Sequence, residues 1–262
     1  MARKIVITSG KGGVGKTTIC ANIGVKLAGL GQKVVLLDLD IGLNNLDVIM
    51  GIENRVVYDI ADVVDGKCRL KQALVQDVRF PTLYTLPSNK IFTTTKINSY
   101  NIKAIVDALG EIFDYVLIDC PAGIDSGFHR AIFGASEAIV VCTPHISSIR
   151  DADKVLTILG SYKLSSVGFV VNRVRGDLIL GGQMIDVNHI CNLLKSNLIG
   201  VVPDDDSVST NQSMTNFETN GGNSFEMLAK NIHFCQNNIY NYKSKYSGFF
   251  GALKRKIRQK FQ

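Results

Sequence analysis

The stretch that decides the fold is residues 9–18, which read Ser9-Gly10-Lys11-Gly12-Gly13-Val14-Gly15-Lys16-Thr17-Thr18. It contains the phosphate-binding pattern G-x-x-x-x-G-K-[ST], in which glycines let backbone N–H groups surround phosphate oxygens. In this pattern Lys16 reaches the β- and γ-phosphates, and the Thr17 hydroxyl holds Mg²⁺. The sequence therefore predicts a site for a nucleoside triphosphate.

The segments on both sides of this loop fit that prediction. Residues 4–8 form an apolar run that predicts a buried strand, and residues 17–30 predict a helix that ends at Gly31. A helix that begins under the phosphates adds partial positive charge there. The order strand, loop, helix therefore favours a functional phosphate loop over a chance match.

Apolar runs alternate with helical patterns along most of the chain. Strands are predicted at 33–38, 83–87, 115–119, 138–143, 167–172 and 198–202, and helices at 58–65, 102–113, 127–133, 148–160, 187–194 and 225–240. Such alternation predicts right-handed βαβ crossovers. We therefore expect an α/β fold of the P-loop NTPase type, with a mostly parallel twisted sheet and helices on both faces. The polar segment 204–224 is predicted to be a loop.

Two of the predicted strands end in carboxylates. One ends with Asp38 and is followed closely by Asp40, and another ends with Asp119. Ligands bind beyond the carboxyl ends of parallel strands, so these acids are placed to hold Mg²⁺ beside a phosphate loop. We assign Thr17, Asp38 and Asp119 to the metal, and Asp40 to positioning of the attacking water. The alternative is that these acids are ordinary polar strand ends and helix caps.

A further polar side chain, Asn172, ends the apolar run 167–172. Its amide offers a donor and an acceptor side by side, which suits the edge of an adenine. The turn Pro203-Asp204-Asp205 is expected to close over the same base. The signal is weak alone, because asparagine is also a common turn residue.

The cysteines and the apolar runs limit the class of protein. Six cysteines are dispersed without a C-x-x-C pair, which favours a reducing compartment and counts against a zinc or iron–sulfur site. No apolar run approaches the length of a membrane span. Because the first predicted strand begins at residue 3 or 4, we expect no signal or transit peptide.

The net charge of +6 comes from the C-terminal segment. Residues 243–262 contain seven basic residues and no acid, whereas the rest of the chain carries 22 basic and 23 acidic residues. A basic body surface for nucleic acid is therefore not expected. We predict an ATPase domain over residues 1–242, a linker over 243–247 and an amphipathic helix over 248–262.

Residues 248–262 combine an apolar stripe with a basic face. On a helix, Phe249, Phe250, Leu253, Ile257 and Phe261 share one side, and Lys254, Arg255 and Arg258 lie opposite. This pattern is typical of a helix that lies in a membrane interface. Two alternatives are docking onto the protein's own core, disfavoured by five cations within 254–260, and a nucleic-acid arm, disfavoured by three phenylalanines on one stripe. We predict an anionic membrane surface as partner, and no nucleic acid.

One such helix is expected to bind a membrane weakly. Each cation near an anionic leaflet contributes about 1 kcal/mol. A short helix is marginal in water, so ordering it opposes this gain. A dimer presents two helices, and the second inserts at high effective concentration. Dimerisation would therefore switch membrane binding on.

Together these motifs resemble the deviant Walker A ATPases, the ParA–MinD family of P-loop ATPases. The resemblance rests on residues 11–18, on Asp38-x-Asp40-Ile41-Gly42-Leu43, on Asp119-x-Pro121-Ala122-Gly123 and on Val171-Asn172-Arg173. Further matches lie at residues 45–47, 55–59 and 147–151, so the resemblance extends over nearly the whole chain. Within the family, the members that place the division septum are the most similar.

The resemblance implies roles for particular residues. It implies an ATP-dependent homodimer with two ATP molecules at its interface, in which Lys11 reaches the partner's phosphates. Without it, Lys11 is an exposed lysine on a flexible loop. Lys11, Lys16 and Asp40 are assigned to catalysis. ATP binding is assigned to Gly10, Lys11, Gly12, Gly13, Val14, Gly15, Lys16, Thr17, Thr18 and Asn172.

The resemblance also implies partners and a location. It implies a slow ATPase that recruits a MinC-type division inhibitor and is stimulated by a MinE-type activator. Their contacts are expected near the switch loop, residues 41–45, and near residues 148–151, although Asp151 is also read as a helix cap. The protein is expected on the inner face of a membrane, in a cytoplasm or a plastid stroma.

Two departures and three rival functions stay open. Asn44 stands where many relatives have arginine, and Gly221-Gly222-Asn223 replaces a more acidic, proline-containing pattern. The rivals are a ParA-like DNA partition ATPase, an iron–sulfur relative such as the nitrogenase iron protein, and a nucleotide-gated scaffold with negligible turnover. The near-neutral body counts against the first, and the cysteine spacing against the second. Lys16 and Asp40 count against the third.

Overall fold

The structure is a computed structural model that describes residues 1–42, 45–88, 97–205 and 220–247. The expectations for Leu43 and Asn44 therefore concern residues outside the described part of the chain. The same holds for every residue that we assign to the membrane helix, from Phe249 to Phe261.

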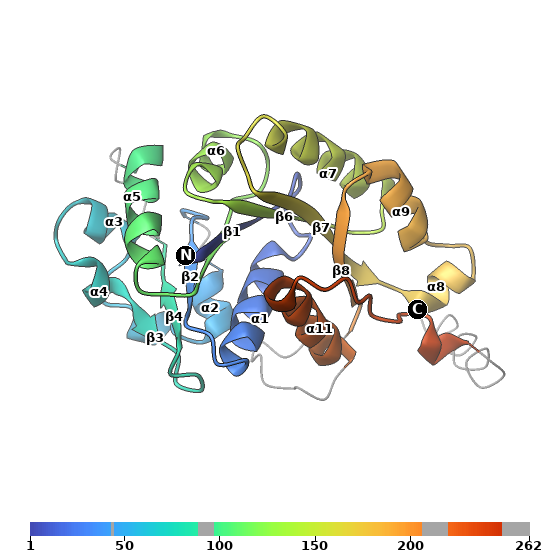
Figure 1. Ribbon diagram of the computed structural model, residues 1–262, viewed down its shortest axis with the longest axis horizontal. Helices are drawn as coiled ribbons and strands as arrows, with labels where there is room; N and C mark the ends of the chain where they lie inside the picture. The colour runs from blue at the N-terminus through green and yellow to red at the C-terminus, as the bar shows by residue number, and fades with distance from the viewer. Residues whose placement is uncertain (43–44, 89–96, 206–219, 248–262) are drawn as a thin grey trace.

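One eight-stranded sheet runs through the molecule in the order β3-β4-β2-β5-β1-β6-β7-β8 (Figure 1). Its strands are β1 Arg3–Thr8, β2 Val34–Asp38, β3 Val75–Gln76, β4 Leu83–Leu86, β5 Tyr115–Asp119, β6 Glu137–Cys142, β7 Ser166–Val174 and β8 Asn197–Pro203. Every neighbouring pair is parallel except β3 and β4. The predicted α/β class with a mostly parallel sheet is confirmed.

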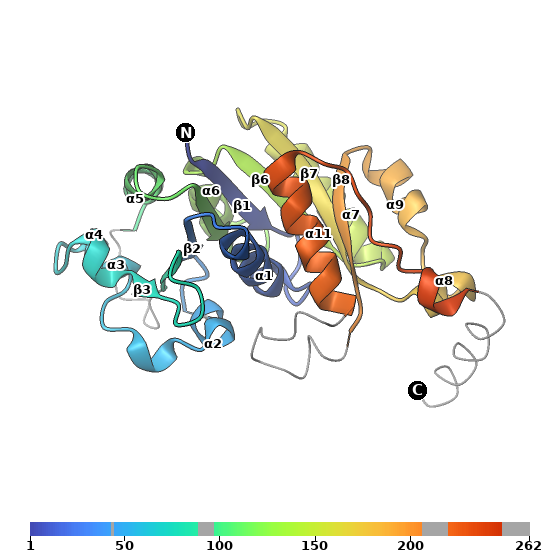
Figure 2. The same cartoon turned by 60° about the horizontal axis from the view of Figure 1, so that its bottom comes forward.

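Helices cover both faces of this sheet (Figure 2). The α-helices are α1 Lys16–Gly29, α2 Leu46–Met50, α3 Ile60–Val64, α4 Leu70–Ala73, α5 Ser99–Gly110, α6 Ser126–Phe133, α7 Ile146–Leu159, α8 Gly176–Leu180, α9 Val187–Leu194 and α11 Asn220–Phe234, and short 3₁₀ turns lie at η1 Glu53–Arg55 and η2 Ser244–Tyr246. Helices α1, α2 and α11 pack on one face, with α1 beside α11. Helices α3 to α7 and α9 pack on the other.

Alternate residues of each strand enter the two cores. In β2, Val35 and Leu37 pack on the α5 side, whereas Val34 and Leu36 pack beneath α1. All five residues of β2 are buried. A strand covered on both faces has no position for an exposed polar side chain, which explains why these runs are apolar throughout.

The structure corrects the last predicted helix. Helix α11 begins at Asn220 and ends at Phe234, not at 225 and 240, so residues 220–224, expected to be loop, are helical. Two glycines lower helix propensity at this start. Against that, the Asp205 carboxylate accepts the N–H of Gly221 at 3.1 Å, and Phe225 is buried in the core under α11. Beyond Phe234, the left-handed Cys235, with φ of 54°, ends the helix.

The chain after α11 packs back onto the domain. In the segment expected to be a linker, η2 lies against α8 and Tyr246 is buried. The Lys243 Nζ forms an ion pair with Asp186 at 2.5 Å. The chain is therefore held against the domain up to Tyr246, whereas the predicted domain boundaries stay a prediction. Among the described residues, no helix is both long and apolar enough to span a membrane.

We predict that Gly176→Ala destabilises the protein by about 1–3 kcal/mol, because the new methyl group must be accommodated by moving backbone. A Cβ at Gly176 would lie 2.0 Å from the carbonyl oxygen of Tyr242. Denaturant unfolding measures the effect, and hydrogen exchange should show faster opening of residues 240–247.

Gly29→Ala is the matched control. Its Cβ would meet nothing closer than Phe80 Cε1 at 4.0 Å, near the end of α1. Alanine favours a helix over glycine by about 0.5–1 kcal/mol, so this variant should be as stable as the parent or more stable. Equal losses of stability in the two variants would contradict the packing argument.

Candidate functional site

The phosphate loop joins β1 to α1 at the carboxyl edge of the sheet. Gly15 is the N-cap of α1, with φ of 94°, and Gly13 has φ of 76°. Both angles lie in the left-handed region, which glycine adopts without strain. Lys16 is buried, whereas Lys11 is exposed. The loop therefore has the backbone shape that a phosphate-binding loop requires, with one lysine beneath it and one on its outer surface.

Asn172, at the end of β7, holds this loop from below. Its Nδ2 donates to the carbonyl oxygen of Val14 at 2.8 Å. A Cβ on Gly15 would lie 2.4 Å from the same nitrogen, so no other residue fits at position 15. The structure thus gives Asn172 a loop-positioning contact that the sequence did not predict. Its predicted contact with adenine stays a prediction.

The start of the loop is packed against α7. A Cβ on Gly10 would lie 2.5 Å from the carbonyl oxygen of Asp151 and 2.7 Å from its Cβ. Asp151 is therefore inside α7 and over the loop, and the alternative reading of Asp151 as a cap is wrong. The residue before Ile146, His145, is the N-cap, and its side chain makes no capping hydrogen bond.

Asp38 and Asp119 lie side by side under the loop. They are register partners on the adjacent strands β2 and β5, and both are almost fully buried. Asp38 Oδ1 accepts the N–H of Asp40 at 2.9 Å, and the Asp119 carboxylate is hydrogen-bonded to Thr17. The three residues assigned to the metal from sequence therefore lie close to one another.

The environment of both carboxylates opposes a negative charge. Burial raises the pKa of Asp119 to about 7, against the hydrogen bond from Thr17 and the nearby Lys16. Burial and the neighbouring Asp119 also raise the pKa of Asp38 well above its usual range. Two like charges in a buried site are unfavourable, so a bound cation would stabilise the pair.

The residues present fit a magnesium ion. Asp38 Oδ2 and Asp119 Oδ1 are buried and have no hydrogen-bond partner among the described residues, which is costly unless something binds there. Within the described residues, no group of three His, Cys, Asp or Glu side chains that could hold a metal is present. Magnesium bound with a nucleotide needs only one or two carboxylates, because phosphates and water complete its shell.

Asp40 lies beside Lys16 at the rim of the site. Burial raises the pKa of Asp40, the charge of Lys16 opposes this rise, and Asp125 adds to it. Asp125, which caps α6 through the N–H of Gly127 at 3.0 Å, is thus a second acid near Asp40. Asp125 was not among the site residues predicted from the sequence. Its place six residues after Asp119, directly before a helix, is the signal that marks it.

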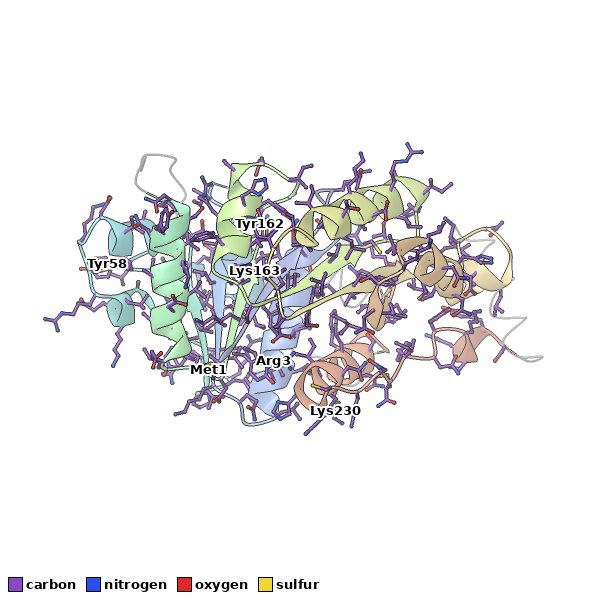
Figure 3. All side chains as sticks on the ribbon, turned by 45° about the horizontal axis from the view of Figure 1, so that its top comes forward. Met1, Arg3, Tyr58, Tyr162, Lys163 and Lys230 are labelled. Atoms are coloured by element: carbon purple, nitrogen blue, oxygen red, sulfur yellow. The ribbon has the colours of Figure 1, made fainter. Side chains whose placement is uncertain are left out.

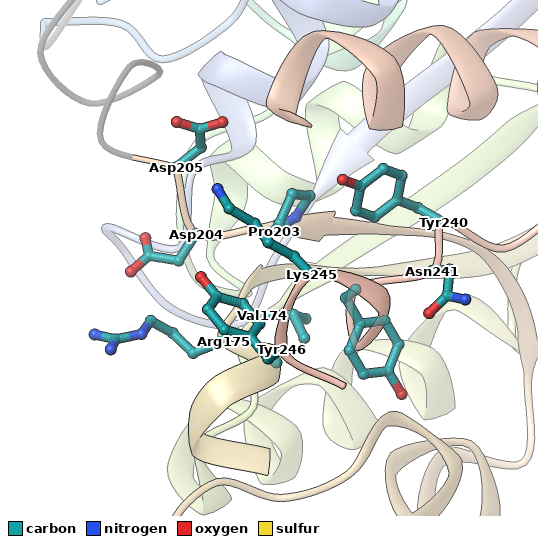
Figure 4. Close-up of a pocket in the computed structure, with 11 residues that line it drawn as sticks. Val174, Arg175, Pro203, Asp204, Asp205, Tyr240, Asn241, Lys245 and Tyr246 are labelled. Carbon is teal, nitrogen blue, oxygen red and sulfur yellow. The ribbon is translucent and has the colours of Figure 1, made fainter. Parts of the chain in front are cut away.

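A pocket of about 120 Å³ lies beyond the ends of β7 and β8 (Figure 4). Asp204 and Asp205 line it together with Lys245 and Tyr246 of the C-terminal segment. The turn expected to close over adenine therefore lines the same pocket as the segment that precedes the predicted membrane helix. The structure brings these two predicted features together.

The predicted partner surface at the start of α7 is only partly exposed. Ser148 is buried, and its hydroxyl accepts the N–H of Thr143 at 2.9 Å, so it supports the turn rather than a partner. Ile146 has an exposed fraction of 71%, and Ser147 and Arg150 are also exposed. An exposed isoleucine at the start of the helix that packs on the phosphate loop is a candidate contact that the sequence did not indicate.

Comparisons with known proteins agree with this site. A family profile described as the CobQ/CobB/MinD/ParA nucleotide binding domain matches residues 5–215. The septum site-determining protein MinD of Bacillus subtilis (strain 168) is 50% identical over 210 residues, which cover 79% of this chain and 78% of that protein.

Two solved structures are similar in fold. The MinC:MinD cell division protein complex of Aquifex aeolicus matches with a TM-score of 0.81 and 39% identity, over 88% of this chain and 95% of that one. The septum site-determining protein MinD of Pyrococcus horikoshii OT3, complexed with Mg-ADP, matches with a TM-score of 0.81 and 30% identity, over 89% and 96%.

We predict that Asp119→Asn stabilises the protein in the absence of nucleotide and Mg²⁺. The folded protein raises the pKa of Asp119 to about 7, so the folded state disfavours the ionised carboxylate. The free energy of unfolding is therefore highest below the unfolded pKa of this carboxyl, and it falls as pH rises toward 7. Unfolding of the parent by denaturant should therefore become easier between about pH 4 and about pH 7. Above that range the variant should be more stable by about 2–4 kcal/mol.

Asp153→Asn, an exposed substitution on α7, is the control and should change stability by less than about 0.5 kcal/mol. The Asp119 variant should also lose Mg²⁺-dependent nucleotide binding. If it were less stable than the parent at high pH, the two buried carboxylates would not be under electrostatic strain.

Proposed function

The chain belongs to the CobQ/CobB/MinD/ParA nucleotide-binding family, and from this premise we propose that it is an ATPase that dimerises with ATP, binds a membrane reversibly and places the division septum. Nucleotide hydrolysis is carried by one observation, the two buried carboxylates with unpaired oxygens beside a phosphate loop. Septum placement is supported by the identity with MinD of Bacillus subtilis.

Different residues of the site bind the phosphates, hold the metal and position the attacking water. The backbone of residues 10–18 and Lys16 bind the phosphates, and Asn172 keeps the loop in shape. Thr17, Asp38 and Asp119 would hold Mg²⁺, which neutralises charge on the phosphates. Asp40 orients the attacking water at the γ-phosphate. A raised pKa suits this residue to accept a hydrogen bond from water and then a proton.

Lys11 completes the site of a second copy. It is exposed on the outer surface of the loop, whereas Lys16 is buried beneath it. A cation in that position is suited to the phosphates of a facing protomer rather than to those of its own. The exposure of Lys11 supports the homodimer with two nucleotides between the protomers, which the family resemblance implies. Hydrolysis is slow until an activator completes or tightens the site.

The remaining assignments concern partners and place. Residues 248–262 bind the anionic inner face of a membrane, from a cytoplasm or a plastid stroma. Because ATP brings two of these helices together in a dimer, membrane binding depends on ATP. A MinC-type inhibitor is supported by the likeness to the MinC:MinD complex, and a MinE-type activator is part of the same proposal. The exposed residues near the start of α7 are the candidate contact.

A complementation experiment tests the role of Lys11. The substitutions Lys11→Ala and Asp40→Ala should each lower the rate of ATP hydrolysis by about 10²–10⁴-fold. Mixed with ATP, they should recover roughly a quarter of the parental rate, because half of the dimers are mixed and each contains one intact site. Phosphate release measures the recovery.

The control pair is Lys16→Ala mixed with Asp40→Ala. Lys16 and Asp40 act on the nucleotide of their own protomer, so every site in the mixture lacks one of them and activity should not return. Recovery in this pair, or none in the first pair, would refute the assignment of Lys11 to the partner's site.

Co-sedimentation with phosphatidylglycerol-containing vesicles tests the membrane function. The full chain should bind with ATP and much less with ADP, and a chain that ends at Ser247 should not bind. A parallel DNA-binding measurement should show no retention. Vesicle binding indifferent to the nucleotide, or ATP-dependent DNA binding without the tail, would instead favour the partition ATPase.

A further inference from the structure

An apolar cavity of about 350 Å³ lies at the amino edge of the sheet, away from the nucleotide site. Its apolar lining comes from Leu74, Pro81, Tyr84, Ile112 and Phe113. Leu74 lies between α4 and β3, Pro81 and Tyr84 belong to the β3–β4 hairpin, and the other two lie in the turn between α5 and β5. The volume is near the lower end of the range for ligand pockets, about 300–1,000 Å³.

The walls of this cavity are held in place by the fold. The Tyr84 and Phe113 rings pack edge to face with centroids 5.4 Å apart. In the hairpin, Gln76 Nε2 donates to the Pro81 carbonyl at 2.8 Å, and Asp77 forms an ion pair with Arg79 at 2.6 Å. A cavity with fixed walls does not have to be ordered when a ligand binds, so less binding free energy is lost.

The charged side chains that line the cavity are both basic. They are Lys33, before β2, and Lys71, in α4, and no acidic residue of the described chain lines it. Asp114 fixes the Lys33 backbone instead, because its Oδ2 accepts the Lys33 N–H at 2.8 Å. Both lysines are exposed, and among the described residues neither forms an ion pair with a carboxylate. The rim therefore complements a negatively charged ligand.

Size and position favour a protein ligand over a lipid. The cavity accommodates one or two large side chains, whereas a bilayer lipid carries two acyl chains. It lies beside β3 and β4, at the opposite end of the sheet from α8 and η2, where the chain leads into the predicted membrane helix (Figure 1). A partner bound here would leave the nucleotide edge and the C-terminal segment free.

We propose that this cavity binds an acidic segment of another protein, with one aliphatic or aromatic side chain inserted between the hairpin and Ile112. The flanking carboxylates of that segment pair with Lys33 and Lys71. The inserted side chain supplies most of the affinity, and the charges supply the on-rate and the selectivity. This site does not depend on the function proposed above.

The test uses the full chain and an array of short peptides, each with one central phenylalanine, leucine or isoleucine flanked by aspartates and glutamates. The best of them is labelled, and its binding is followed by fluorescence anisotropy. Ile112→Asp should weaken binding by at least about tenfold. Lys33→Glu and Lys71→Glu should each weaken it by about three- to tenfold at low salt, and by less at high salt.

Matched variants separate a local effect from a general one. Ile112→Val should keep the affinity, and Lys163→Glu should not change it, because Lys163 is an exposed lysine after α7 and does not line the cavity (Figure 3). Leu193→Asp, on the exposed side of α9, controls for the new acid. ATP hydrolysis and unfolding temperature should be the same in all variants.

Several results would overturn the proposal. One is an array in which no peptide binds saturably, and another is equal weakening by Lys163→Glu. The site would belong to lipid if Ile112→Asp lowered binding to phosphatidylglycerol vesicles instead. It would be a contact between copies of this chain if that variant changed the sedimentation of the protein alone.

Discussion

Two carboxylates buried side by side are the constraint on which the rest of the site depends. Asp38 and Asp119 end adjacent strands with an oxygen each unpaired, in an environment that raises their pKa. Desolvation and mutual repulsion oppose folding at this point, and the apolar layers on both faces of the sheet hold the pair in place. Because β1 lies next to β5 on the other side, the same strand order also brings the phosphate loop to these acids.

Much of the fold was predictable from sequence because its strands are apolar on both faces. A buried parallel strand must be apolar throughout, so the runs that end at Asp38 and Asp119 were placed to within a residue or two. The helices α2, α4 and α8 and the strand β3 were missed, since elements of two to five residues rarely show a clear period. The start of helix α11 was predicted at residue 225 instead of Asn220, because the glycines there disfavour a helix. In the structure, burial of Phe225 stabilises the helix in spite of them.

The residues of the site could be predicted from the sequence, whereas most of the contacts between them could not. Glycines, lysines and carboxylates at fixed spacing identify a phosphate loop and its metal ligands, since the chemistry restricts the residue types. Contacts between segments distant in sequence leave no such pattern. The bond from Asn172 to Val14, the packing of Asp151 on Gly10 and the nearness of Asp125 to Asp40 are of this kind.

The packing of Gly10 against α7 has a mechanical consequence. No space remains between the backbone of the phosphate loop and that of the helix, since even a methyl group at Gly10 would collide with Asp151. Because the two backbones are in direct contact, the helix cannot move toward the loop without displacing it. The exposed start of α7, with Ile146 and Arg150, belongs to the same helix, so a partner that shifted this helix would also shift the loop that holds the phosphates.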